Sequence, residues 1–149
     1  MIRTQAEYES ARERLTQDLA VMAAQRERLA ELGLAPQEVD RAMEPAQSFH
    51  AQLAEEVEAF ERMKRGDLQP IENLQEIGRI LIGLRIARSL TQRQLADRLR
   101  VSESQVSRDE RNDYHGITVE RAQRIINALR GIVTLHAAIE QEDGELVGA

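Results

Sequence analysis

The chain has 149 residues, which suffices for one ordinary domain or for a small domain with an accessory element. Cysteine and tryptophan are absent and aromatic residues make up 3% of the chain, which excludes disulfides, thiolate metal sites, a cysteine nucleophile and a broad aromatic ligand pocket. The net charge of −6 would disfavour nucleic-acid binding if it were evenly spread along the chain, but it is not.

Two long amphipathic helices are predicted in the first 65 residues. Apolar residues of 4–31 recur every seven positions, at Tyr8, Leu15, Met22 and Leu29. Residues 37–65 carry a similar stripe, and Gly33 and Pro36 mark the corner between the helices. Equal helix lengths and a short corner predict an antiparallel helical hairpin over residues 1–66, for partner binding or oligomerisation. A spacer without a partner is the alternative.

The remaining segments follow from helix-breaking residues and charge. Gly66 and Pro70 interrupt helices, so residues 67–73 are interpreted as a linker and residues 74–140 as a second unit. Residues 78–130 hold 11 arginines against 6 acidic residues, whereas the flanking segments are acidic. A basic segment between acidic flanks suits phosphate binding. Residues 141–149 are expected to form a flexible acidic tail.

The opening residues lack the apolar core of a signal peptide. No stretch approaches the ~20 apolar residues that span a bilayer. We therefore expect a cytoplasmic protein that makes no membrane contact.

Two short helices after a helix at 74–88 have unusually complete start signals. Thr91 and Ser102 can each cap a helix, while Gln94 and Gln105, three residues later, can complete a capping box. Helix starts eleven residues apart leave about two turns for the first helix. This spacing indicates a helix-turn-helix.

The second short helix would expose polar side chains that can reach base edges or phosphates. These side chains belong to Glu103, Ser104, Gln105, Ser107, Arg108 and Arg111.

Residues 75–131 resemble the Cro/C1-type (Xre) repressor family. The resemblance implies an all-α fold in which the hairpin precedes a five-helix lambda-repressor-like domain. It also implies a structural ion pair between Arg85 and Glu110, and a Gln92 that contacts the DNA backbone and supports the recognition helix. The pattern departs at Arg100, where the family has a turn glycine, and at Asp109, where it has an apolar residue. A left-handed Arg100 would cost on the order of 1 kcal/mol and favour a reshaped turn; Asp109 would face solvent or pair with a nearby arginine.

Family roles transferred by position place Ser102, Glu103, Ser104 and Arg108 in the major groove and Gln92, Arg111 and His115 near phosphates. Arg108 is the main candidate for a bidentate contact to guanine. The full predicted DNA-binding set is Thr91, Gln92, Ser102, Glu103, Ser104, Gln105, Ser107, Arg108, Arg111 and His115.

The opening MIRTQAEYESARERL resembles the start of HigA-like antitoxins. This resemblance implies that the acidic hairpin binds a small basic RelE-like toxin and that the protein represses its operon at a palindromic operator in bacterial DNA. One recognition helix covers few base pairs, so a homodimer is expected, through the segment from Ile132 to Ile139 or through the hairpin stripe.

Other function classes are disfavoured. The three histidines are far apart, no serine has a histidine–acid partnership, and Gly78 and Gly83 lack a phosphate-loop context. We therefore expect no cofactor, no metal and no enzymatic activity. The alternatives to an antitoxin are a stand-alone or phage-type regulator and a protein-interaction adaptor with a degenerate helix-turn-helix.

Overall fold

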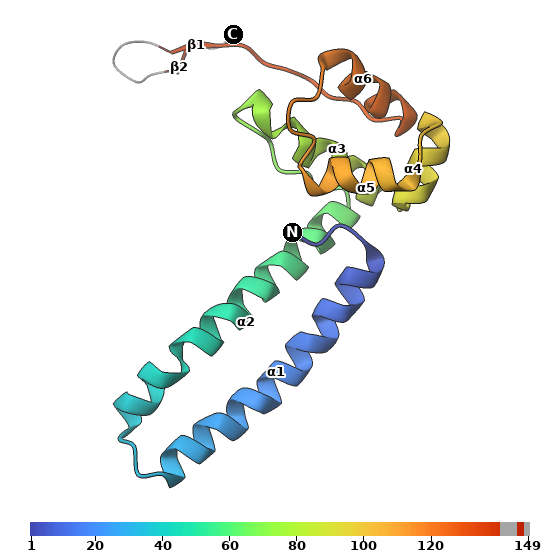
Figure 1. Ribbon diagram of the computed structural model, residues 1–149. Helices are drawn as coiled ribbons and strands as arrows, with labels where there is room; N and C mark the ends of the chain where they lie inside the picture. Colours follow the sequence, from blue (N-terminus) through green and yellow to red (C-terminus); the bar gives the residue numbers. More distant parts are fainter. Residues whose placement is uncertain (141–145, 148–149) are drawn as a thin grey trace.

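Two long helices project from a bundle of shorter ones in the computed structural model, which describes residues 1–140 and 146–147 (Figure 1). The α-helices of these residues are α1 (Gln5–Glu31), α2 (Pro36–Lys64), α3 (Ile77–Ala87), α4 (Gln92–Leu99), α5 (Glu103–Arg111) and α6 (Val119–Ala128). A single 3-10 turn, η1 (Leu74–Glu76), precedes α3. The prediction of an all-α fold with an N-terminal antiparallel hairpin is confirmed.

The hairpin begins and turns where its sequence dictates. The Thr4 hydroxyl accepts a hydrogen bond from the Glu7 amide at 3.2 Å, and the Glu7 carboxylate accepts one from the Thr4 amide, which satisfies two amides that the first helical turn leaves free. Gly33 has a φ of 87° after α1, a left-handed conformation that glycine adopts without strain. Pro36 is the first residue of α2, where its missing N–H has no consequence.

The bundle encloses its own apolar centre. Helices α4 and α5 pack against each other, and α6 covers α3 and α4. The largest apolar side chains buried between them are Leu81, Ile82, Leu95, Val106, Ile125 and Leu129. Short helices are marginal on their own, so this burial is what keeps α4 and α5 helical.

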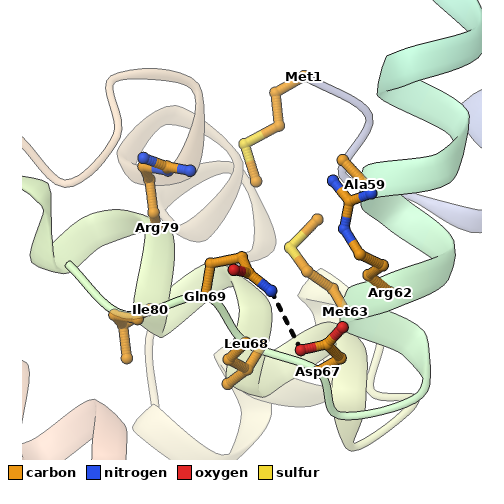
Figure 2. Close-up of a pocket in the computed structure, with 9 residues that line it drawn as sticks. All are labelled: Met1, Ala59, Arg62, Met63, Asp67, Leu68, Gln69, Arg79 and Ile80. Atoms are coloured by element: carbon orange, nitrogen blue, oxygen red, sulfur yellow. Dashed lines mark hydrogen bonds between the residues drawn. The ribbon is translucent and has the colours of Figure 1, made fainter.

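The hairpin and the bundle share one hydrophobic core. Helix α2 contacts α3, and the buried Val57 and Phe60 of α2 belong to the same cluster as Ile82 and Ile86 of α3. The N-terminus lies at this junction (Figure 1). Beside it, Met63, Leu68 and Ile80 line an apolar hollow of about 240 Å³, with arginines at its rim (Figure 2).

The C-terminal end of the bundle differs from the expected fifth α-helix. Residues 132–138 have no regular secondary structure, so the bundle holds four α-helices and the 3-10 turn. Arg130 takes a left-handed φ of 50°, and three β-branched residues, Ile132, Val133 and Thr134, follow Gly131. Both features disfavour a further helix.

A two-stranded antiparallel pair follows this extended segment. Strand β1 (Ile139–Glu140) pairs with β2 (Leu146–Val147), with Ile139 opposite Val147. Apart from these two residues of β2, the predicted flexible tail at 141–149 lies outside the described residues.

Candidate nucleic-acid interface

The helix-turn-helix begins with two capped helices. The Thr91 hydroxyl accepts from the Gln94 amide at 3.1 Å, and the Gln94 side chain accepts from the Thr91 amide at 2.9 Å, as the predicted capping box requires. Ser102 caps α5 by accepting from the Gln105 amide at 3.2 Å. The second capping box was predicted wrongly, because the Gln105 side chain donates to the Asp109 carboxylate at 3.0 and 3.1 Å. A hydrogen bond to a carboxylate is stronger than one to a neutral backbone group.

The turn between α4 and α5 places Arg100 in the left-handed region. Arg100 has φ 57° and ψ 42°, and its amide donates to the Asp97 carbonyl at 3.2 Å. The next amide, of Val101, donates to the Ala96 carbonyl at 3.0 Å. The arginine therefore adopts the conformation for which glycine is usually selected, and its side chain is exposed.

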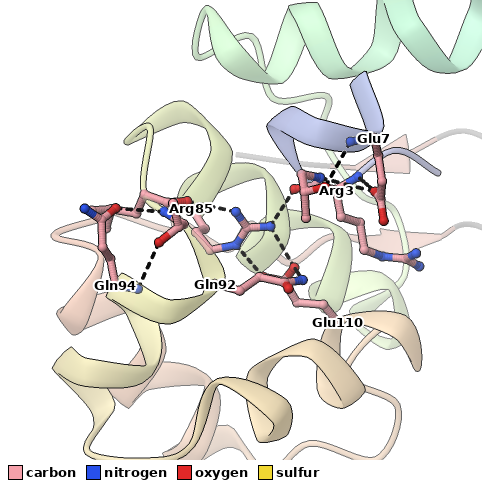
Figure 3. Close-up of polar contacts among 9 residues, drawn as sticks. Arg3, Glu7, Arg85, Gln92, Gln94 and Glu110 are labelled. Atoms are coloured by element: carbon pink, nitrogen blue, oxygen red, sulfur yellow. Dashed lines mark hydrogen bonds and ion pairs between the residues drawn. The ribbon is translucent and has the colours of Figure 1, made fainter. Parts of the chain in front are cut away.

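A buried polar cluster connects α3, α4 and α5 behind the exposed face of α5 (Figure 3). The Arg85 guanidinium binds the Glu110 carboxylate in bidentate fashion, with Nε to Oε1 at 2.5 Å and Nη2 to Oε2 at 2.7 Å. Gln92, the first residue of α4, donates to Glu110 Oε2 at 2.8 Å. Glu110 is fully buried and Arg85 is 2% exposed, so each charge depends on the other for compensation. This is the ion pair that the family resemblance implies.

Asp109 pairs with an arginine, which is one of the two outcomes that its unusual position allows. Its carboxylate accepts from Arg121 of α6 and from Gln105 of α5. The contact with Arg121 ties α5 to α6, and the contact with Gln105 lies within α5. Where an apolar residue would pack, the chain uses a half-buried ion pair with a second hydrogen bond.

The ten predicted DNA-binding residues divide by exposure. The residues that are exposed on and around α5 and at the start of α4 are Thr91, Ser102, Glu103, Ser104, Arg108, Arg111 and His115. Gln92, Gln105 and Ser107 are half-buried. Two of these three form hydrogen bonds to other side chains: Gln92 donates to Glu110, and Gln105 accepts from Arg108 Nη2 at 3.1 Å. The exposed face of α5 thus combines Glu103 and Ser104 with two arginines, Arg108 and Arg111.

Two residues of this neighbourhood could not be predicted from sequence pattern. Arg3 reaches the cluster from the start of the chain, where its carbonyl oxygen accepts from Arg85 Nη2 at 2.8 Å. Arg121 lies on the polar side of an amphipathic helix, as many surface arginines do. The unusual position of Asp109 indicated that an arginine could lie nearby, but it did not indicate which arginine.

Two negative observations concern the described residues. Within 1–140 and 146–147, no three side chains of His, Asp or Glu lie close enough together to hold a metal ion. No helix in this part of the chain is both long and apolar enough to cross a membrane.

Comparison with known proteins identifies the bundle. Residues 81–132, about a third of the chain, match the family model described as helix-turn-helix, of the Cro/C1 type. No curated protein and no solved structure matches the chain. The match runs from within α3 to just beyond α6 and includes the capped helices, the Arg100 turn and the Arg85–Glu110 pair. Residues 81–132 are therefore similar to helix-turn-helix domains, and this similarity supports a DNA-binding regulator.

Proposed function

We propose that the protein is a transcriptional repressor that reads its operator with α5 in the major groove. The observation that carries the proposal is the exposed polar face of a helix whose opposite side is held by the buried Arg85–Glu110 pair. A recognition helix needs both properties, because base contacts require side chains within hydrogen-bonding reach and a fixed register. Arg108 suits guanine, and Glu103 can accept from a cytosine amino group.

Charge along the chain supports this role. The 11 arginines of residues 78–130 outnumber the acidic residues there, so the DNA-facing unit is basic although the whole chain is acidic. Cations near phosphates release condensed counterions, which gives affinity that falls as salt rises. The acidic hairpin projects away from the bundle (Figure 1), so most of its length extends beyond the basic unit.

The repressor acts as a homodimer on a palindromic operator, because two recognition helices ~34 Å apart read two half-sites. Of the two candidate dimer surfaces, the C-terminal one is favoured by exposure. Ile132 is 90% exposed, Leu135 67% and Ile139 79%, and a groove of about 640 Å³ lies between this segment and the linker. Most of the hairpin stripe, by contrast, is turned inward against its own partner helix.

The hairpin binds a small basic partner, and the protein is an antitoxin of the HigA-like kind. Support comes from the opening sequence and from the charge of residues 1–70, which hold 14 acidic residues against 9 basic ones. An acidic surface and a basic RNA-cleaving toxin are electrostatically complementary, which speeds association and favours the correct partner. The toxin is a RelE-like ribonuclease, and its gene lies next to the gene that encodes this chain.

Selection of duplexes from random sequence by the purified full-length protein tests the repressor. We expect a palindromic consensus, protection of two half-sites in footprinting, and a log–log salt slope that reflects several phosphate contacts. A protein that binds no duplex at low salt is an adaptor instead, and the repressor proposal fails. Co-expression with the neighbouring reading frame tests the antitoxin role separately. Co-purification with relief of growth arrest supports it, and a neighbour that neither binds nor arrests growth contradicts it.

A further inference from the structure

The first three residues of the chain bridge the hairpin and the bundle, and we call them the N-terminal strap (residues 1–3). The Met1 ammonium pairs with Glu56 of α2 at 3.1 Å. The Ile2 side chain is 6% exposed and lies in the shared core. The Arg3 guanidinium pairs with Asp113, which follows α5, at 3.2 Å. The strap is therefore held on both units.

The strap also supplies an acceptor to the ion pair behind the recognition helix (Figure 3). Arg85 Nη2 donates to the Arg3 carbonyl at 2.8 Å and to Glu110 Oε2 at 2.7 Å. Arg85 Nη1 donates to the Leu90 carbonyl at 2.8 Å. The guanidinium thus has four hydrogen bonds while only 2% of the residue is exposed.

We propose that the N-terminal strap positions the recognition helix: through the Arg3 carbonyl it holds Arg85, and through Arg85 it holds Glu110 and Gln92. This inference rests on the proposed DNA-binding function, since it concerns how the reading helix is kept in register. Arg3 acts here through its backbone and through Asp113, and it touches no base.

The physical reason is the cost of an unpaired buried donor. Without the Arg3 carbonyl, Nη2 of the buried guanidinium loses one of its two acceptors, so Arg85 shifts or water enters. Glu110 Oε2 accepts from both Arg85 and Gln92, so a shift of Arg85 reaches the first residue of α4 and the last turn of α5. A hollow of about 290 Å³ beside the strap, lined also by Gln92 and Glu103, gives water a route to this cluster.

The arrangement gives the hairpin a direct connection to the DNA-reading face. Glu7 of α1 accepts from the Arg3 amide at 2.8 Å, so the first turn of the hairpin orients the carbonyl that holds Arg85. Any partner that moves the start of α1 also moves this acceptor. Binding at the hairpin and binding at DNA are then coupled through one hydrogen-bonded cluster.

Ile2→Asp in the full-length protein tests the strap, because a carboxylate cannot remain in the apolar seat of Ile2. Solvent exchange of the Arg85 Nε–H is measured by NMR without DNA, and affinity is measured for the duplex that the wild-type protein selects. We expect at least tenfold faster exchange and about tenfold weaker binding, with helical content retained. Arg26→Ala, which removes an exposed ion pair with Asp40 far along the hairpin, is the control and leaves both quantities unchanged.

A double-mutant cycle separates positioning from general destabilisation. If the strap acts through Glu110 and Gln92, Ile2→Asp weakens binding much less in a Gln92→Ala background. An equal loss in both backgrounds overturns the proposal, as does unchanged Arg85 exchange or unchanged affinity. Should the wild-type protein bind no duplex, the proposed function fails, and the exchange measurement alone decides whether the strap holds Arg85.

Discussion

Arg108 is the exposed residue of α5 with the strongest capacity to specify a base. Its guanidinium donates to Gln105 in the free protein and can offer two parallel N–H donors to guanine O6 and N7. We expect Arg108→Ala to weaken binding to the selected operator by about 1–3 kcal/mol, and to relax sequence preference at one position. Competition titrations with operator variants measure both effects.

Arg41→Ala is the matched control for this substitution, since it removes the same charge from an exposed site on the hairpin. It should reduce operator affinity only slightly and leave sequence preference intact. If Arg41→Ala and Arg108→Ala weaken operator and unrelated duplexes alike, Arg108 acts as a general cation and its assignment to a base is wrong.

Tyr114 provides a pH-dependent contribution to stability. The residue is 4% exposed, and burial, together with Glu110 and Asp109, raises the pKa of its phenol above the ordinary value of 10.0. The unfolded chain therefore ionises first. Stability is complete below pH 10 and is lost as pH rises toward the folded-state pKa, by up to about 1.4 kcal/mol per pH unit.

Tyr114→Phe should flatten this decline, as urea unfolding at pH 8, 10 and 11 will measure. The pKa of Tyr8, the other tyrosine, is also raised, mainly by its hydrogen bond to Glu61, so Tyr8→Phe measures how much of the decline comes from that phenol. If the decline above pH 10 is as steep in Tyr114→Phe as in the wild type, the buried phenol does not cause it.

At the residue scale, sequence predicted what local rules and family positions encode. The capping of α4 and α5 follows from neighbours within a few positions, and the strain at Arg100 follows from its place where the resembled family has a turn glycine. The Arg85–Arg3 contact joins residues 82 positions apart and uses a backbone carbonyl, so no pattern of side chains in the sequence predicts it. The hydrogen-bond partner of the Gln105 side chain was predicted wrongly, because the capping rule does not consider competition from the Asp109 carboxylate one helical turn away.

The turn between α4 and α5 is one of the places where a non-glycine residue takes a left-handed backbone conformation. A non-glycine residue at the φ of Arg100 carries a conformational cost that glycine avoids. We expect Arg100→Gly to raise the free energy of unfolding by about 0.5–1 kcal/mol in DNA-free protein. Urea denaturation followed by circular dichroism measures the change.

Arg93→Gly, which also replaces an arginine by glycine, is expected to lower the free energy of unfolding. Arg93 is exposed inside α4, where glycine costs about 1 kcal/mol of helix stability. Opposite signs at the two positions would show that backbone conformation, and not loss of an arginine, determines the outcome. Destabilisation by Arg100→Gly would contradict the assignment of strain to the turn.

At the element scale, periodicity predicted the two long helices within one residue of α1 and α2, because seven-residue spacing and the caps agree. The end of the bundle was harder to predict. Residues 132–139 contain four large apolar residues that suit either a helix face or an extended segment. Backbone preferences of the three β-branched residues decided in favour of the extended form.

At the scale of the whole molecule, the hairpin and the helix-turn-helix domain are one hydrophobic unit. A linker composition at 67–73 suggested separable parts, yet Phe60 and Ile82 lie in the same buried cluster. Sequence periodicity identifies which face of a helix is apolar and does not identify what covers it. The hairpin therefore stabilises the DNA-binding bundle, and this role is separate from the binding of any partner.

A shared core predicts that the two units unfold together. Phe60 is 3% exposed and stacks on Tyr8 with ring centroids 5.0 Å apart, so Phe60→Ala should lower the free energy of unfolding by about 3–5 kcal/mol. Urea titrations followed by NMR at amides of α1 and of α6 should give one midpoint, shifted equally in both helices. Phe49→Ala, on the same helix but at a 71% exposed position, should change stability by less than about 0.5 kcal/mol. Separate midpoints for α1 and α6 would show that the contact between α2 and α3 is too weak to join the units, and the coupling between hairpin and recognition helix would then lack its structural basis.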